Sequence, residues 1–142
     1  MIKINKKSDS IVIVIHEIYG INQHIKSYCE LLSEQNFDVL CPNLLDKINP
    51  YDYSQEETAY HNFIETVGFT NAVKTIQNLV VELKDDYNKI FIVGFSVGAT
   101  VAWLCSELKY LNGIVGYYGS RIRNYIDIQP KCPTMLYFPE EE

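Results

Sequence analysis

Apolar positions along the chain change between two spacings, which predicts strands alternating with helices. Residues 10–16, SIVIVIH, are β-branched and apolar on both faces, as is typical of a strand covered by helices on both sides. Asn22 is then expected to cap a helix that runs to about Asn36, because apolar residues recur there at helical spacing. A second strand is expected over residues 37–42, ending at Pro42.

The same alternation continues after a polar segment. Residues 43–61 are expected to form a loop with some helical turn, and residues 62–85 a helix in which Gly68 marks a late start or a break. The remaining expected elements are a strand at 88–95, a helix at 97–111 and strands at 113–119 and 132–138. Repeated strand–helix units imply right-handed crossovers. The sequence therefore predicts an α/β fold, a doubly wound, mainly parallel sheet flanked by helices.

Composition and charge narrow the class of protein. The 142 residues, with 47% apolar content, suit a single domain over residues 1–142 with a sizeable core. A net charge of −6, with no basic cluster larger than NKK, argues against nucleic acid as a partner. The longest apolar run, IVIVI, is too short for a membrane span or a signal peptide. We therefore expect a cytoplasmic protein with no membrane partner.

The four cysteines do not have the spacing of a metal site. Cys29, Cys41, Cys105 and Cys132 form no C-x-x-C pair and lie in or beside apolar segments. Reduced core thiols are therefore expected rather than zinc ligands or a disulfide framework.

The stretch GFSVG, residues 94–98, joins the expected strand at 88–95 to the helix that follows. Glycines on both sides permit a tight turn, and Ser96 would stand at the carboxyl end of the sheet beside a helix N-terminus, where backbone N–H groups favour negative charge. This context predicts a nucleophile elbow. The alternatives are a helix-capping serine or a phosphate-binding turn. A Walker-type loop is excluded, because no G-K-[ST] follows.

Several motifs, in this order, resemble the dienelactone hydrolase family of α/β-hydrolases over nearly the whole chain. They are HEIYG at 16–20, PNL at 42–44, GFSVGA at 94–99 and GIVGYYG at 113–119. The resemblance implies that Glu17 is a buried glutamate near the nucleophile and that the N–H groups of Ile18 and Val97 form the oxyanion hole. Such a hole needs one donor after the nucleophile and one from a loop after an earlier strand.

Simpler interpretations of this loop remain open. Glu17 can be a solvated loop acid or a partner of a helix dipole. For His16, at the end of a strand, a hydrogen-bonded core histidine is expected rather than a base.

The chain departs from the family at the nucleophile and its base. Dienelactone hydrolases proper carry cysteine where this chain has Ser96, and a serine needs a general base. In α/β-hydrolases the nucleophile precedes the acid and then the histidine, but His16, His24 and His61 all precede Ser96. The resemblance places the triad acid at or beside Glu142 and the histidine on further chain. We therefore expect roughly the first two-thirds of a family member, with little esterase activity as an isolated monomer, and His61 as the one rival base.

The arginines bear on the substrate. Arg121 and Arg123 are the only arginines, and they follow the strand at 113–119. Both are expected to face an anionic substrate group, with Arg121 as the substrate-binding candidate, or to form a solvated loop pair. Tyr118 is expected to be a wall of the substrate site or a core residue. The family places a carboxylate-binding arginine after the second strand, where this chain has none, so dienelactone itself is not expected.

The expected function is therefore a serine hydrolase acting on a small-molecule ester or lactone. It is expected to need no metal or organic cofactor. The alternative is a catalytically silent protein that binds a ligand or protein partner in the same crevice.

Overall fold

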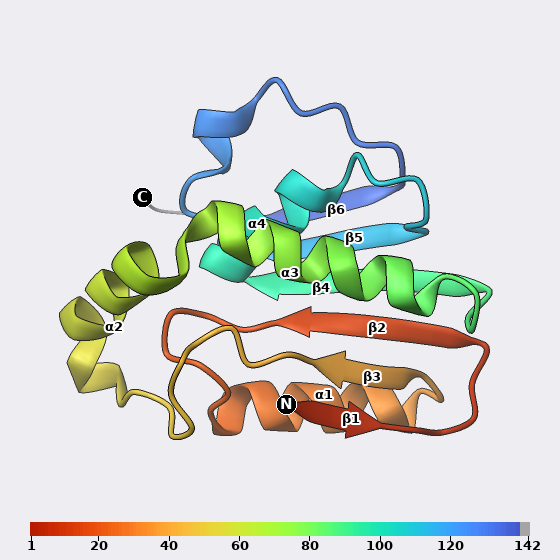
Figure 1. Cartoon of the computed structure of the whole chain (residues 1–142), viewed down its shortest axis with the longest axis horizontal. Helices are drawn as coiled ribbons and strands as arrows, with labels where there is room; N and C mark the ends of the chain where they lie inside the picture. The colour runs from red at the N-terminus through yellow and green to blue at the C-terminus, as the bar shows by residue number, and fades with distance from the viewer. Residues whose placement is uncertain (140–142) are drawn as a thin grey trace.

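A six-stranded sheet forms the centre of the computed structural model, which describes residues 1–139 (Figure 1). Its strands are β1 (Ile2–Ile4), β2 (Ser10–Ile15), β3 (Asp38–Cys41), β4 (Lys89–Phe95), β5 (Gly113–Tyr117) and β6 (Thr134–Tyr137). They lie in the order β1-β3-β2-β4-β5-β6, and every neighbouring pair is parallel except β1 with β3. The predicted mainly parallel sheet is confirmed. The sequence missed the antiparallel β1, because three residues are too few to show an alternation.

Helices cover both faces of this sheet (Figure 1). Helix α1 (Gln23–Glu34) packs on one face, and α3 (Gly68–Leu83) and α4 (Val97–Cys105) pack on the other. Neighbouring residues of β2 therefore enter different cores: Ile13 faces α3 and α4, Val14 faces α1, and both are fully buried. This explains why the β2 sequence is apolar at consecutive positions.

The ends of α1 agree with the expected signals. The Asn22 side-chain oxygen accepts a hydrogen bond from the Ile25 N–H at 3.2 Å, so Asn22 is the predicted N-cap. After the last turn, Asn36 takes a left-handed conformation with φ of 69°, which ends the helix.

The polar segment before α3 is more helical than predicted. A 3-10 turn (Tyr53–Gln55) leads into α2 (Glu56–Asn62), and a π-helical turn (Phe63–Val67) connects α2 to α3. Of α2 only Ala59 is buried, so the helix lacks the apolar stripe from which it could be predicted. Gly68 has φ of 71° and interrupts the helix as expected. Helix α2 lies beyond the carboxyl edge of the sheet, at the left of Figure 1.

Helix α4 ends at Cys105, earlier than its apolar pattern predicts. The carbonyl of Ser106 accepts a hydrogen bond from the Lys131 N–H at 2.8 Å instead of continuing the helical ladder. The indole N–H of Trp103 donates to the carbonyl of Tyr125 at 2.9 Å. Tyr125 ends a 3-10 turn (Ile122–Tyr125), so the loop after β5 is fastened to α4.

The face of the sheet that carries α1 is open over β4, β5 and β6 within residues 1–139. An apolar groove of about 320 Å³ runs there beside Tyr28 of α1, and Met135 is 56% exposed. At the carboxyl ends of these strands the rings of Phe95, Tyr117 and Tyr137 stack in register, with centroids 5.2 and 5.0 Å apart. None of the helices formed by residues 1–139 has both the length and the apolar character of a membrane span.

Candidate active site

Ser96 occupies a strained turn between β4 and α4. Its φ and ψ are 56° and −117°, a backbone conformation that residues other than glycine rarely adopt. Hydrogen bonds hold the turn on both sides: the Ser96 N–H donates to the Tyr117 carbonyl at 2.7 Å, and its own carbonyl accepts from the N–H groups of Ala99 and Thr100. Ser96 is half-buried. Strain of this kind, maintained by surrounding contacts, is a recurring property of functional sites.

The two flanking glycines permit the turn because no side chain fits at either position. A Cβ on Gly94 would lie 2.1 Å from the Gly98 carbonyl oxygen. A Cβ on Gly98 would lie 2.4 Å from the Ile15 carbonyl oxygen and 2.8 Å from that of His16. The backbone at the start of α4 is therefore in direct contact with the backbone at the ends of β2 and β4. The contact brings the loop after β2 next to Ser96.

Two backbone N–H groups become available where these segments meet. Val97 is the first residue of α4 and Ile18 lies in the loop after β2, and neither N–H donates a hydrogen bond within residues 1–139. Both side chains are buried. Unpaired donors of this kind, at a helix N-terminus and in a neighbouring loop, can stabilise an oxyanion.

His16 is a structural residue, as the sequence predicted. Its Nε2 accepts a hydrogen bond from the Leu44 N–H at 2.9 Å, so the proton is on Nδ1, which donates to the Glu17 carbonyl at 2.6 Å. The ring is fully buried, and burial lowers its pKa to about 4. With both nitrogens engaged, His16 is not available as a base.

Glu17 is half-buried, with one carboxyl oxygen in a place that water does not reach. This Oε1 atom is buried and has no hydrogen-bond partner within residues 1–139. Burial raises the pKa of the carboxyl, and the charge of His24 acts in the opposite direction. This is the direction of pKa shift expected from the sequence. A carboxyl group can accept a hydrogen bond from a neighbouring group, or donate one when it is protonated.

The other two histidines lie on different helices. His61 is on α2, where its ring meets Tyr60 edge-on with centroids 6.2 Å apart. His24 is on the first turn of α1, edge-on to Phe95 at 5.0 Å. The sequence indicates no role for His24, although its position just after the N-cap places it at the same edge of the sheet as the elbow.

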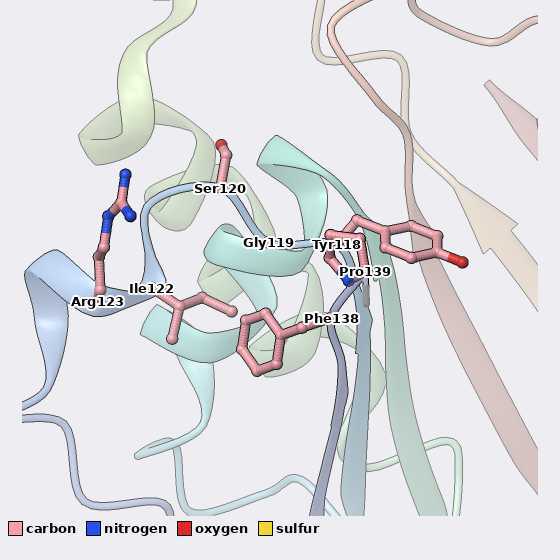
Figure 2. A pocket seen from close by; sticks show the side chains of 7 residues that line it. All are labelled: Tyr118, Gly119, Ser120, Ile122, Arg123, Phe138 and Pro139. Carbon is pink, nitrogen blue, oxygen red and sulfur yellow. The ribbon is translucent and has the colours of Figure 1, made fainter. Parts of the chain in front are cut away.

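Arg121 and Arg123 have different surroundings. The Arg121 guanidinium donates a hydrogen bond to the Tyr60 hydroxyl and lies 5.7 Å from the centre of that ring, so it is held by α2. Arg123 lines a pocket of about 450 Å³ at the carboxyl ends of β5 and β6. In Figure 2 the side chains of Ile122 and Phe138 point toward one another across it.

Tyr118 also lines this pocket, with φ of 59° and 57% of its surface exposed. Tyr118 and Arg123, rather than Arg121, line this pocket, but their side chains lie at opposite ends of it and point apart (Figure 2). Glu142, the expected triad acid, lies outside the described residues.

The dienelactone hydrolase family model matches residues 2–141 of this chain. An uncharacterized protein of Bacillus subtilis, YczH, is 42% identical over 132 residues, which are 93% of this chain and 64% of YczH. A carboxymethylenebutenolidase of Pseudomonas putida is 24% identical over 138 residues, covering 89% of this chain and 58% of the enzyme. The chain therefore spans less than two-thirds of the length of these relatives.

Solved structures with the same fold have low sequence identity to this chain. The dienelactone hydrolase-like promiscuous phosphotriesterase P91, from metagenomic libraries, superimposes with a TM-score of 0.70 at 15% identity over 94% of this chain and 58% of its own. XC6422 from Xanthomonas campestris, an α/β serine hydrolase without a lid, gives 0.61 at 14% identity over 91% and 57%. These similarities establish an α/β-hydrolase fold.

Proposed function

Because the chain belongs to the dienelactone hydrolase family, we propose that it acts as a serine hydrolase that cleaves an ester or lactone of a small molecule through Ser96. The observation that supports this most directly is the strained backbone of Ser96 between two glycines that admit no side chain. A capping serine needs no such conformation, whereas a nucleophile at a strand-to-helix turn does.

In the proposed reaction the Ser96 Oγ attacks the substrate carbonyl carbon. The negative charge that develops on the carbonyl oxygen accepts hydrogen bonds from the N–H groups of Ile18 and Val97, and loss of one such donor typically costs about 10²-fold in rate or more. The bond from the carbonyl carbon to the alkoxide breaks, and the alkoxide departs as the alcohol with the proton that the serine hydroxyl has lost. A water molecule then adds to the acyl carbon, the acid leaves, and Ser96 regains its proton. The poorly hydrated Glu17 carboxyl is proposed to hydrogen-bond the resting hydroxyl.

The pocket beside Tyr118 is the proposed place for part of the substrate. Ile122 and Phe138 supply apolar walls and Arg123 a positive charge, while Arg121 would contribute through Tyr60. Glu142 is proposed as the triad acid on the family resemblance alone.

The second candidate is a catalytically silent hydrolase-fold protein that binds a ligand or partner in the same crevice. One observation favours it: within residues 1–139, no histidine is hydrogen-bonded to the Ser96 hydroxyl. A serine without a base is a weak nucleophile.

Labelling with a fluorophosphonate probe separates the two candidates. We expect the wild-type chain to be labelled at Ser96, and Ser96→Ala to remain unlabelled. Ser120→Ala is the matched control, because this exposed serine lines the neighbouring pocket and should label like the wild type. Equal labelling of Ser96→Ala and wild type would remove Ser96 as the nucleophile, and no labelling of any variant would favour the silent protein.

A further inference from the structure

We propose that Arg121 is a positioning residue that holds helix α2 across the carboxyl end of β4, where the helix limits the size of the ester that reaches Ser96. Because it concerns access to the nucleophile, this inference rests on the proposed hydrolase function. Arg121 would act on the choice of substrate through α2, and not by contact with the substrate itself.

The chain that leads into α2 is fastened to the loop after β2. The Tyr51 N–H donates a hydrogen bond to the Tyr19 carbonyl at 2.9 Å. The rings of Tyr19 and Tyr53 meet edge-on, with centroids 4.8 Å apart. Tyr53 opens the 3-10 turn that runs directly into α2, and its hydroxyl accepts a hydrogen bond from the Asn22 amide at 3.3 Å. Because Tyr19 directly follows Ile18, α2 begins beside a proposed oxyanion-hole donor.

The second half of α2 is fastened to the loop after β5. The Arg121 guanidinium donates a hydrogen bond to the Tyr60 hydroxyl and lies 5.7 Å from the centre of that ring. Both side chains are half-buried, and Arg121 forms no salt bridge within residues 1–139. Of α2 itself only Ala59 is buried. With so little of the helix in the core, the charge-assisted bond from Arg121 supplies much of what holds α2 in place.

These two fastening points lie on either side of β4. The strand order places β4 between β2 and β5, and the three strands are parallel, so the loops after β2 and β5 flank the turn that carries Ser96. Two strand spacings, about 10 Å, separate β2 from β5. The 7 residues of α2 span about the same length. Helix α2, which Figure 1 shows beyond the carboxyl edge, therefore bridges the two loops across the end of β4.

The connection from α2 to α3 allows the helix to tilt. It is the π-helical turn that begins at Phe63, and turns of this type recur at functional sites. Gly68 follows with φ of 71° and ψ of 158°, a conformation open essentially to glycine alone, and a Cβ there would meet no atom within 4 Å. Phe63 itself is fully buried and meets the ring of Phe69 edge-on at 5.4 Å. The base of α2 is thus anchored in the core, while the part beyond it is held mainly through Tyr60.

This arrangement predicts selection by size. A small ester fits between α2 and the elbow, whereas a bulky one must displace α2 and break the bond between Arg121 and Tyr60. Loss of a hydrogen bond to a charged group typically shifts an equilibrium about 10-fold or more. Removing the bond should therefore favour bulky reagents at position 96 by about that factor.

Ser96→Cys measures access to the elbow without requiring catalysis, because its thiol reacts with maleimides directly. Cys132→Ser in the same chain removes the one cysteine of the four that is not buried. The two probes, N-methylmaleimide and N-(1-pyrenyl)maleimide, share a reactive group and differ in size. We expect the ratio of the pyrenyl rate to the methyl rate to rise about 10-fold on adding Arg121→Ala. Tyr60→Phe, which keeps the ring beside the guanidinium, should raise it by less.

Two further variants separate this role from a general loss of stability. Arg121→Lys keeps a charged donor beside the Tyr60 ring and should return the ratio to within about threefold of the starting chain. Tyr110→Phe is the matched control, because it also removes a phenol hydroxyl beside a cation, Lys84 at 5.3 Å, and should change the ratio by no more than about twofold. In hydrogen exchange, Arg121→Ala should speed the exchange of α2 amides and leave those of α1 unchanged.

An unchanged ratio in both Arg121→Ala and Tyr60→Phe would overturn the proposal. Faster exchange in α2 without a change in the ratio would also overturn it, since α2 would then be held by Arg121 without covering Ser96. If Arg121→Ala does not fold, Tyr60→Phe, which loses a single oxygen atom, decides the outcome. Failure of the hydrolase proposal is seen separately, as fluorophosphonate labelling of the wild type no faster than that of Ser96→Ala, and the maleimide ratio still reports whether α2 covers the elbow.

Discussion

Substituting alanine for Gly98 should disturb both the stability and the chemistry of this protein. The new Cβ would lie 2.4 Å from the Ile15 carbonyl oxygen and 2.9 Å from its carbon, and both are backbone atoms of β2 that cannot rotate away. Relief requires α4 to move from β2 by about 1 Å, and overpacking of this kind costs about 3 kcal/mol at the upper end of its usual range. With an unfolding entropy of about 2.1 cal/mol/K per residue, or about 0.3 kcal/mol/K for the chain, the melting temperature should fall by about 10 °C.

The same displacement acts on the proposed oxyanion hole. Val97 precedes Gly98 on α4, and Ile18 is three residues after Ile15, so moving α4 from β2 separates their N–H groups. A misplacement of about 1 Å can cost about 10²-fold in rate. We therefore expect Gly98→Ala, measured below its melting temperature, to be labelled by a fluorophosphonate about 10²-fold more slowly than wild type.

Gly113→Ala is the matched control. Its Cβ would meet the ring edge of Phe91 at 3.2 Å, and a side chain can shift by a few tenths of an ångström where backbone cannot. This variant should melt within about 3 °C of wild type, because a change of about 1 kcal/mol corresponds to that shift. If Gly98→Ala melts like Gly113→Ala and is labelled at the wild-type rate, the interlocked backbone of β2 and α4 is not what positions the elbow.

Three further outcomes follow from single residues. Ser96→Gly should raise the unfolding free energy by about 1 kcal/mol in urea titrations, because glycine adopts the φ of 56° without strain, and Ser96→Ala should not. Burial lowers the pKa of His16 to about 4 in the folded chain, from about 6.5 in the unfolded chain. As the pH drops from 6.5 to 4, the unfolded chain is protonated first, so the free energy of unfolding should fall by about 3 kcal/mol in total. His16→Gln should flatten this part of the plot of stability against pH. Burial alone would raise the pKa of Asp38, but hydrogen bonds lower it, including the one that the Tyr87 hydroxyl donates at 2.5 Å. The ionised Asp38 therefore stabilises the folded chain above about pH 4, and this contribution is lost as the carboxylate is protonated at lower pH. Tyr87→Phe should lower the free energy of unfolding by about 1 kcal/mol at pH 7 and by less at pH 3.

Most of the sheet could be predicted from the sequence because each buried strand carries its own signal. SIVIVI is apolar at consecutive positions since both faces of β2 are covered, and the glycines of GFSVG match a turn that only they allow. Helix α2 could not be predicted, because it rests on the core mainly through Ala59 and otherwise faces water. Strand β1 depends on its partner β3 rather than on a pattern of its own.

The candidate site could be predicted where it depends on local backbone and not where it depends on distant side chains. Ser96, Glu17 and the two N–H donors follow from motifs that stand next to strand ends. The bond between Arg121 and Tyr60 joins residues 61 positions apart, and no local pattern indicates it. The contact between His24 and Phe95 likewise appears only once α1 is folded onto the sheet.

Trp103 is the only tryptophan of the chain, and it lies on the helix that begins at the elbow. Its half-buried indole is held to the Tyr125 carbonyl, so its surroundings change if α4 and the loop after β5 separate. The emission of this single fluorophore therefore reports on one part of the molecule without any label. A red shift in the wavelength of maximum emission would reveal loosening of α4 before the rest of the sheet unfolds.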